Sequence, residues 1–388
     1  MRTASKLMTA VLAGLLPMQL VMAEDLLTVY RMAVSSDPVL KAADAERRAQ
    51  LELEPQAMAE LLPRVDLFGD TNYLNFKNSD GYNTNNLTIS ARQPIFRLDR
   101  MKRLDQSKFE VAEAEYQYDS AEQQLIIRTA NAYFALLDAE VEVAFAIADK
   151  KAIGRQLEQA QRRFEVGLVT ITDVYEAQAR YDRSIANEII AVNERADAQE
   201  ALRQLTGQGI PSVFFLSQDL PLVTAQPHDV EAWVEEARRN NPAILAARAT
   251  VDSAGEEVEV QRAANYPSVD AVASYINDNS NAPLARDLDG GVIGLELSLN
   301  IFAGGGIASR TRQAADLRER ALEGMENSIR TVERQTRDAF RNLDATISFV
   351  NAVNQTVISS RSAAEATQAG FDVGTRTIVD VLDAERDL

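Results

Sequence analysis

The chain has 388 residues, no cysteine and a single histidine, and its 58 acidic residues outnumber its 40 basic ones, giving a formal net charge of −18 at pH 7. The lack of cysteine excludes disulfide scaffolds, thiolate metal sites and cysteine nucleophiles, and a lone histidine argues against a histidine-rich metal centre or a Ser-His-Asp triad. An acidic chain is also a poor nucleic-acid binder, because binding to phosphates needs clustered Lys and Arg. Most enzyme classes are therefore disfavoured, although carboxylate chemistry is left open.

The first 23 residues have the pattern of a secretory signal peptide. A basic start is followed by the apolar run 7–21 and by a small-residue cleavage site ending at Ala23, so the mature chain is expected to begin at Glu24. The run is short and is interrupted by Pro17, which argues against the alternative of a membrane anchor. After Ala23 no apolar run approaches the roughly 20 residues of a spanning helix. A membrane role must therefore come from β-strands.

The remaining sequence repeats itself. The segment 164–174 (FEVGLVTITDV) has the same residue or the same charge as 371–381 (FDVGTRTIVDV) at eight of eleven positions, and the offset is 374 − 167 = 207 residues. Earlier in each copy, Asp37-Pro38 resembles Asn241-Pro242. A duplication in matching order indicates two copies of one supersecondary unit. We place the copies at 24–225 and 226–388.

Each copy begins with two predicted helices. A short amphipathic helix ends near Pro38 or Pro242, and a second helix runs to Pro63 or Pro267. In the first copy Asp37-Pro38 suits a helix start, because Asp can cap and Pro fits the first turn. Pro55 is expected to kink this second helix.

A β-hairpin is predicted next in each copy, at about 64–97 and at about 268–302, with turns rich in Asn, Asp, Gly and Ser at 77–86 and 277–291. In the clearest strand, Ile293, Leu295 and Leu297 alternate with polar or small residues. This alternation is typical of a membrane barrel wall, although soluble hairpins would share it. The signal peptide favours the membrane. Four strands cannot close a barrel, since the smallest bacterial barrels have about eight, and an open edge cannot lie in lipid; three chains would supply twelve strands.

A very long helix is predicted after each hairpin, at 98–166 and at about 309–370. The first range contains no Pro and a single Gly, and a helix of that length spans on the order of 100 Å. Such length without breaks suggests a coiled coil. Gly167 and Gly374 are expected to end these helices, and returning helices follow, the first to about 206–207. The second copy stops about 25 residues earlier than the first, so we expect a truncated sequence that lacks the last returning helix.

The two tips carry the most specific family signature. The segment 164–174 and the run 373–384 (VGTRTIVDVLDA) resemble the two helix-turn-helix tips of the TolC family, and 129–134 and 93–96 are similar to further signatures of that family. The resemblance covers nearly the whole mature chain. It implies a membrane α+β protein: a homotrimer with a twelve-stranded outer-membrane β-barrel that continues into a periplasmic α-helical coiled-coil barrel.

The resemblance also implies a function. Such a trimer is a passive exit duct for efflux or type I secretion, whose closed periplasmic end opens on docking to a periplasmic adaptor and an inner-membrane ABC or other transporter. Outer-membrane lipid is the other expected partner. No cofactor, enzymatic activity, intrinsic metal or nucleic acid is implied.

Two acidic residues are candidates for a selective aperture. Asp380 and Asp383 lie three apart on a predicted helix and face one way. In a trimer they would place six carboxylates around one axis, a ring that favours cations and could be blocked by multivalent ones. Spacing alone fits a solvated helix start as well, and the ring is what the resemblance implies. Asp173 and Glu176 occupy the matching positions of the first copy.

The resemblance further implies a gate network, formed by Arg376, Asp173, Thr172, Gln156 and Phe371. Arg376 can form a forked pair with Asp173, although an exposed pair is worth only about 0–1 kcal/mol. Phe371 departs from the family's Tyr, which removes one hydrogen bond from the latch. The expected adaptor-docking turns contain Gly167, Leu168, Gly374 and Thr375.

The main alternative is a periplasmic coiled-coil adaptor. It would share the export signal and a long helical hairpin, but it would not have two copies that each contain a strand hairpin. An enzyme is a distant third, and a glycosidase, which needs carboxylates across a cleft, is set aside because the paired acids lie at duplicated helix turns. His228 is interpreted as a loop residue between the copies and Trp233 as a packing residue on the next helix. The sequence does not choose between protein and drug cargo.

Overall fold

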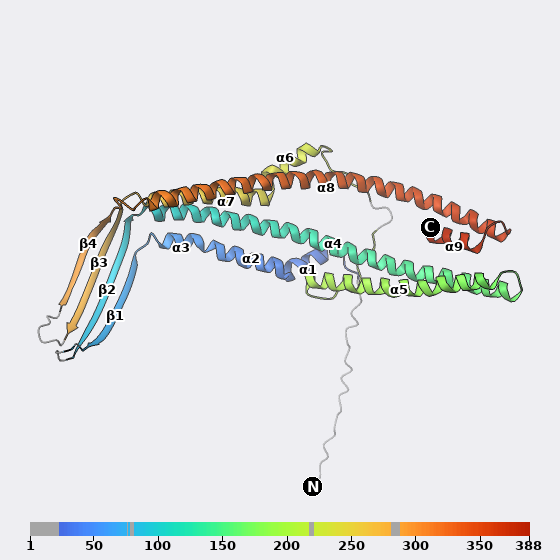
Figure 1. The fold of residues 1–388 in the computed structure, drawn as a ribbon, viewed down its shortest axis with the longest axis horizontal. Helices are drawn as coiled ribbons and strands as arrows, with labels where there is room; N and C mark the ends of the chain where they lie inside the picture. Colours follow the sequence, from blue (N-terminus) through green and yellow to red (C-terminus); the bar gives the residue numbers. More distant parts are fainter. Residues whose placement is uncertain (1–22, 76, 78–80, 217–220, 281–287) are drawn as a thin grey trace, which may run out of the picture. The chain divides into compact units, whose positions relative to one another are not determined.

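The computed structural model describes residues 23–75, 77, 81–216, 221–280 and 288–388 (Figure 1). The predicted signal peptide therefore lies outside the described residues, apart from Ala23. Within these ranges, no helix combines the length and hydrophobicity that a bilayer crossing requires. The chain divides into two compact units: Met1–Asp37, Ile126–Leu220 and Ala366–Asp387 form the first, and Pro38–Leu125, Pro221–Glu365 and Leu388 the second. Each unit draws on both sequence copies.

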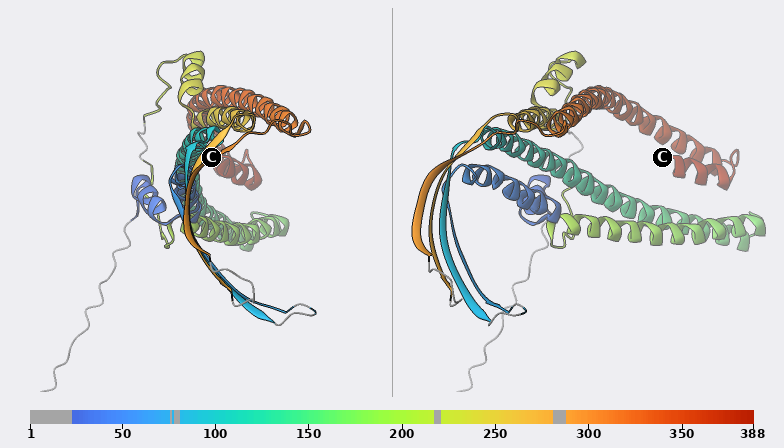
Figure 2. Two further views of the ribbon diagram at one scale, coloured as in Figure 1. Left: turned by 90° about the vertical axis from the view of Figure 1, so that its left-hand side faces the viewer. Right: turned by 60° about the vertical axis from the view of Figure 1, so that its left-hand side comes forward.

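The second unit contains a four-stranded antiparallel sheet in the order β1-β2-β3-β4. Its strands are β1 (Arg64–Leu74), β2 (Tyr82–Phe96), β3 (Ser268–Ser280) and β4 (Leu288–Ser298). Figure 2 shows that the four strands bend together along their length. The two hairpins, which come from different copies, are joined by pairing between β2 and β3. One sheet is thus built from both halves of the sequence.

Strand alternation gives this sheet one apolar face and one polar face. Val65 lies opposite Ala91, and Ala271 lies opposite Leu295, on the apolar face. The polar face carries Arg92 and, two residues from it in register, the pair Asp270 and Glu296. Successive side chains of a strand point to opposite faces, so the sequence pattern alone determines which residues share a face.

The turns predicted at 77–86 and 277–291 are too long. Asn85 is paired in β2 with Thr71 of β1 and with Asn279 of β3, and β4 already begins at Leu288. The Thr71 hydroxyl also donates to Asn85 Oδ1 at 2.6 Å. Asn, Asp, Gly and Ser favour turns, but the main-chain ladder continues through these residues because it uses only backbone groups.

The second unit also contains helices that precede or follow the strands along the chain. They are α2 (Pro38–Leu51), α3 (Leu53–Ala59), the start of α4 (Leu98–Glu165), α6 (Val230–Asn240), α7 (Pro242–Ala263) and most of α8 (Gly306–Asp372). The break between α2 and α3 confirms the predicted kink, because the ring of Pro55 opposes the carbonyl of Leu51, where α2 ends. The helices α4 and α8 confirm the two long helices predicted at 98–166 and at about 309–370.

The linker between the copies contacts helices of the second unit. His228 is a loop residue, as interpreted, but its ring lies 5.2 Å from that of Phe340 and its Nε2 lies 3.6 Å from Asp344 Oδ2. The Trp233 indole N–H donates to the carbonyl of Pro227 at 2.9 Å. These contacts tie the linker to α6 and α8, a role that sequence spacing did not indicate.

The first unit contains α1 (Leu26–Ser36), α5 (Ile171–Thr206), α9 (Ile378–Asp387) and the adjoining parts of α4 and α8. Its main core packs Val29, Tyr133, Leu136, Leu202 and Val213. Burying side chains of this size stabilises a fold by about 1.5–3 kcal/mol each.

A partly buried ion pair adds to this unit. Arg128 donates from Nη1 to Asp37 Oδ1 at 3.2 Å and from Nη2 to Asp37 Oδ2 at 2.8 Å. The Asp37 side chain is only 2% exposed, against 35% for that of Arg128. A paired geometry of this kind satisfies both carboxylate oxygens.

Candidate channel gate at the helix tips

Both helix tips turn through a glycine in the left-handed region. Gly167 has φ 75° and Gly374 has φ 81°. The N–H of Leu168 donates to the carbonyl of Arg163, and the N–H of Thr375 donates to that of Gly370, both at 2.8 Å. Such a turn closes a helix end, and a residue with a Cβ would be strained there. The predicted helix ends are confirmed, and the two tips have matching geometry.

Each returning helix begins with a capping box. Asp173 Oδ2 accepts from the N–H and the hydroxyl of Thr170, each at 2.8 Å. In the second copy Asp380 Oδ2 accepts from the N–H of Thr377 at 2.8 Å and from its hydroxyl at 2.9 Å. The aspartates chosen as gate and aperture residues are thus also structural caps.

Loss of a cap should loosen one tip without changing its charge. We expect Thr377→Ala to cost about 1 kcal/mol of local stability, because the backbone N–H of Asp380 loses its acceptor at 3.2 Å. Amide hydrogen exchange of the first turn of α9 should become about fivefold faster. Thr172→Ala is the control, since the Thr172 side chain has no hydrogen bond within the described part of the chain. Equal exchange in both variants would contradict a role for the cap.

The two candidate aperture acids have different surroundings. The pKa of Asp380 is lowered, first by the hydrogen bond from the backbone N–H of Thr377 and then by that from its hydroxyl. Asp383 instead faces Arg180 of α5, whose Nη1 lies 2.9 Å from Asp383 Oδ1. No sequence motif indicates this role of Arg180, because it belongs to the other copy and lies 203 residues away.

The predicted gate residues lie at or near the tips, but within one chain they are not all joined. No ion pair between Arg376 and Asp173 occurs among the residues that the structure describes, so that pair stays a prediction. Arg376 packs beside Gly370, where an added Cβ would lie 2.8 Å from its Cγ. Thr172 is exposed, and the buried Oε1 of Gln156 has no hydrogen-bond partner within the described ranges.

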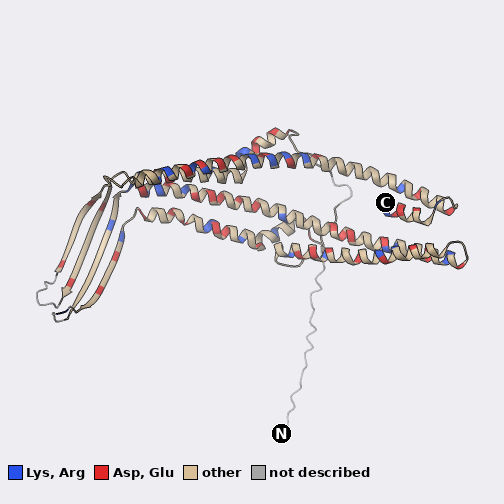
Figure 3. Ribbon diagram, viewed as in Figure 1, with Lys and Arg blue, Asp and Glu red and all other residues tan. Residues whose placement is uncertain are grey.

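Phe371 has a contact that the sequence did not predict. The guanidinium of Arg163 lies over its ring, with Cζ 4.5 Å from the ring centroid. A cation over an aromatic face is worth about 0.5–1 kcal/mol at exposed sites. This contact joins α4 to α8 at the position where the family's tyrosine hydroxyl is lacking. Acidic and basic residues occur together at both tips (Figure 3).

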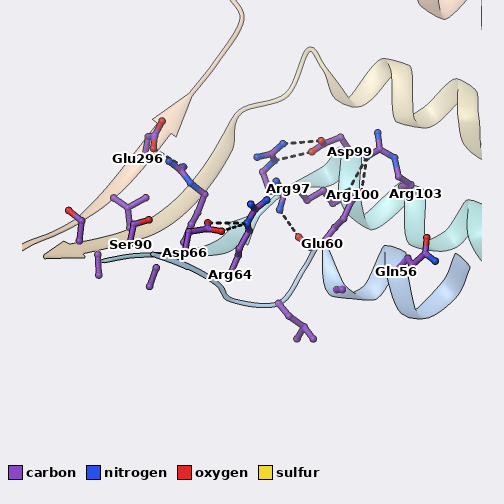
Figure 4. Close-up of a pocket in the computed structure, with 17 residues that line it drawn as sticks. Gln56, Glu60, Arg64, Asp66, Ser90, Arg97, Asp99, Arg100, Arg103 and Glu296 are labelled. Carbon is purple, nitrogen blue, oxygen red and sulfur yellow. Dashed lines mark hydrogen bonds and ion pairs between the residues drawn. The ribbon is translucent and has the colours of Figure 1, made fainter. Parts of the chain in front are cut away.

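A second charged region lies in the second unit, where the sheet meets α3 and α4. A cavity of about 800 Å³ is lined there by five arginines: Arg64, Arg92, Arg97, Arg100 and Arg103. Figure 4 shows Arg97 directed toward Asp99 and Arg64 beside Asp66. Arg92 bonds to Glu296, Arg100 to the carbonyl of Glu60 and Arg103 to the carboxylate of Glu60. Each cation therefore has an oxygen partner.

Known proteins of one family are similar to this chain over nearly its whole length. The family model "Outer membrane efflux protein" matches residues 29–208 and 233–388. The chain is 36% identical over 377 residues to the outer membrane protein TolC of Vibrio cholerae, covering 95% of this chain and 85% of that protein. It is 28% identical to the alkaline protease secretion protein AprF of Pseudomonas aeruginosa, covering 94% and 79% respectively.

A solved structure shows the same fold. The outer membrane protein VceC of Vibrio cholerae superposes with a TM-score of 0.78 at 20% identity, covering 94% of this chain and 89% of that one. Together with the two matched segments, this confirms the TolC-like architecture of two tandem repeats. The chain belongs to the outer membrane efflux protein family, as its tip motifs predicted.

Proposed function

We propose that three copies of this chain form a passive exit duct, which passes cargo out of the cell after docking to a periplasmic adaptor and an inner-membrane transporter. As a member of an outer-membrane efflux family, the chain is a channel protein of the outer membrane with its long helices in the periplasm. Members of this family work with such adaptors and transporters. The duct moves its cargo without reacting with it.

The observation that carries this proposal is the sheet. The apolar side chains of β4 are strongly exposed, 89% for Ile293 and 75% for Leu295, as expected for a face that contacts lipid. β1 and β4 are the edges of the sheet, and edge N–H and C=O groups cannot be left unpaired in lipid. Pairing β4 of one copy with β1 of the next would satisfy both edges, and three copies would close a barrel of twelve strands.

Assembly is tested on the purified protein. Chemical cross-linking and native mass measurement in detergent should give a trimer, and cell fractionation should place it in the outer membrane. A monomeric, water-soluble protein in the periplasm would overturn the proposal. The alternative of a periplasmic adaptor predicts that second outcome.

The cargo class is proposed from the relatives. Among the matched proteins are a protease secretion protein and a cobalt-zinc-cadmium resistance protein, so we infer export of proteins, small toxic molecules or both. Accumulation assays in cells lacking the duct, with a secreted protein and with a toxic compound, distinguish these cargoes.

The gate is proposed to be held shut by Arg376. Both cap bonds of Asp173 use its Oδ2, so Oδ1 can accept from a guanidinium of a neighbouring subunit. We expect Arg376→Ser to raise single-channel conductance in planar bilayers, because an ion pair that closes the gate is lost. Arg330→Ser is the control, since Arg330 pairs only one turn along α8 with Glu326. Unchanged conductance for Arg376→Ser would contradict the latch.

A further inference from the structure

The pair formed by Arg180 and Asp383 connects the two sequence copies at the tips. It joins α5 to α9 with a 2.9 Å contact, and its side chains are 30% and 47% exposed. Residues Val381 and Leu382 of α9 are buried, which fixes the face that α9 presents to α5. The contact is thus held by packing on one side and by charge on the other.

The duplication makes this pair unusual. With the offset of 207, Arg180 corresponds to Asp387 (387 − 180 = 207) and Asp383 corresponds to Glu176 (383 − 176 = 207). The cross-copy pair of Arg180 with Asp383 therefore has opposite charges, whereas the equivalent pair of Glu176 with Asp387 would have two negative charges. A basic residue stands at only one of the four equivalent positions, and it faces a predicted aperture acid.

The other aperture acid has no such partner. The printed hydrogen bonds of Asp380 come from Thr377, a neutral donor, and no ion pair to Asp380 occurs in the part of the chain that the structure describes. The two acids that spacing made equivalent therefore differ in their nearest cation: Asp383 contacts Arg180 directly, whereas Arg376 acts on Asp380 only at a distance.

Arg180 lines a groove between helices. Arg180 and Leu382 line one groove of about 340 Å³ between α4, α5 and α9, with Asp149 and Arg183 among its other polar residues. Two charges at this distance interact more strongly when they are partly withdrawn from water. Arg183 also lines the groove but makes no ion pair within the described residues, so Arg180 is the arginine positioned to neutralise Asp383.

We propose that Arg180 is a selectivity-determining residue of the aperture, which masks Asp383 and leaves Asp380 as the main acidic ring. This rests on the proposed function, because the ring requires a trimeric duct. In that trimer the fixed charge facing passing ions falls from six carboxylates to three. Arg180 thereby sets how strongly the aperture holds a multivalent cation.

The test is block of single channels by Gd³⁺ in planar bilayers, together with the reversal potential in a KCl gradient. Arg180→Gln should lower the half-blocking Gd³⁺ concentration at least about tenfold and shift the reversal potential toward that of K⁺, because a trivalent ion then meets one more negative charge in each subunit. Arg180→Lys keeps the positive charge, so its half-blocking Gd³⁺ concentration should equal that of the unaltered protein. Arg183→Gln is the matched control, and its half-blocking Gd³⁺ concentration should also be unchanged.

A double variant separates charge masking from simple adhesion between helices. Asp383→Asn combined with Arg180→Gln removes both charges, so Gd³⁺ block should return to the level of the unaltered protein. The masking role is overturned if Arg180→Gln has the same half-blocking Gd³⁺ concentration as Arg183→Gln, or if it changes only the conductance. If the unaltered protein forms no channel at all, the proposed function fails instead.

Discussion

Replacing Asp380 by asparagine is expected to raise the half-blocking Gd³⁺ concentration of single channels by about a hundredfold, since it removes the one unmasked negative charge of each subunit from the aperture. The asparagine side chain retains an oxygen that can accept from the N–H and the hydroxyl of Thr377, which now bond to Asp380 Oδ2. Asparagine is tolerated in helix caps, so the variant changes charge while the tip keeps its fold. Conductance in planar bilayers with increasing Gd³⁺ measures the effect.

The duplication supplies a matched control for this experiment. Asp173 has the same place in the first copy (380 − 173 = 207) and the same capping bonds to Thr170. Asp173→Asn should therefore remove an equal charge from an equivalent turn yet retain Gd³⁺ block, whatever it does to opening. If the two variants lose block equally, the ring is not confined to the second copy.

The pH dependence of block should follow from the same geometry. The pKa of Asp380 lies below its usual 3.8 because its charged form accepts hydrogen bonds from Thr377. A lowered pKa keeps the carboxylate ionised as the pH falls, so block by Gd³⁺ should persist through mildly acidic conditions and disappear only below the ordinary titration range of aspartate.

The largest effect on stability is expected from Arg128→Leu. It would leave the carboxylate of Asp37, which is 2% exposed, without its two-bond partner. Because a buried carboxylate then loses two charge-assisted hydrogen bonds to a partly exposed arginine, we expect a cost of about 1.5–3 kcal/mol. The free energy of unfolding, followed by circular dichroism in urea, should fall by that order.

Two comparisons make this result specific. Adding Asp37→Asn should recover part of the loss, since the buried carboxylate is then replaced by a neutral amide. Arg330→Leu removes a pair whose side chains are 75% and 48% exposed, and it should cost no more than about 1 kcal/mol. A cost for Arg128→Leu as small as that of Arg330→Leu would show that Asp37 is not held by this pair.

The parts of the fold that are local in sequence were predictable. Glycines 167 and 374 and the lack of proline between 98 and 166 were enough to place the long helices and their turns, because helix continuation and termination depend on neighbouring residues. The two hairpins are predicted correctly, but their predicted turns are too long. Asparagines such as Asn85 favour turns in general, whereas here they pair through their backbone. The family itself was readable from the tip motifs.

Contacts between distant segments were not predictable in the same way. Asp37 was interpreted only as a possible cap, although it is paired with Arg128, 91 residues away. Arg180 and Arg163 gave no periodic or motif signal, and their partners became visible only when α5 was placed beside α9 and α4 beside α8. The pair of Arg376 with Asp173 stays a prediction, because no contact between these two residues occurs within the described residues.

The charged cavity beside the sheet bears on what cargo encounters. Its five arginines are matched by five carboxylates, those of Glu60, Asp66, Asp99, Asp270 and Glu296, so this polar wall offers hydrogen-bonding groups without a surplus of either sign. If it lines the proposed duct, it should bind neither an acidic polypeptide nor a cationic drug strongly. One channel could then pass cargoes of opposite charge. Selection among them would depend on the helix tips and on the partner proteins that deliver the cargo.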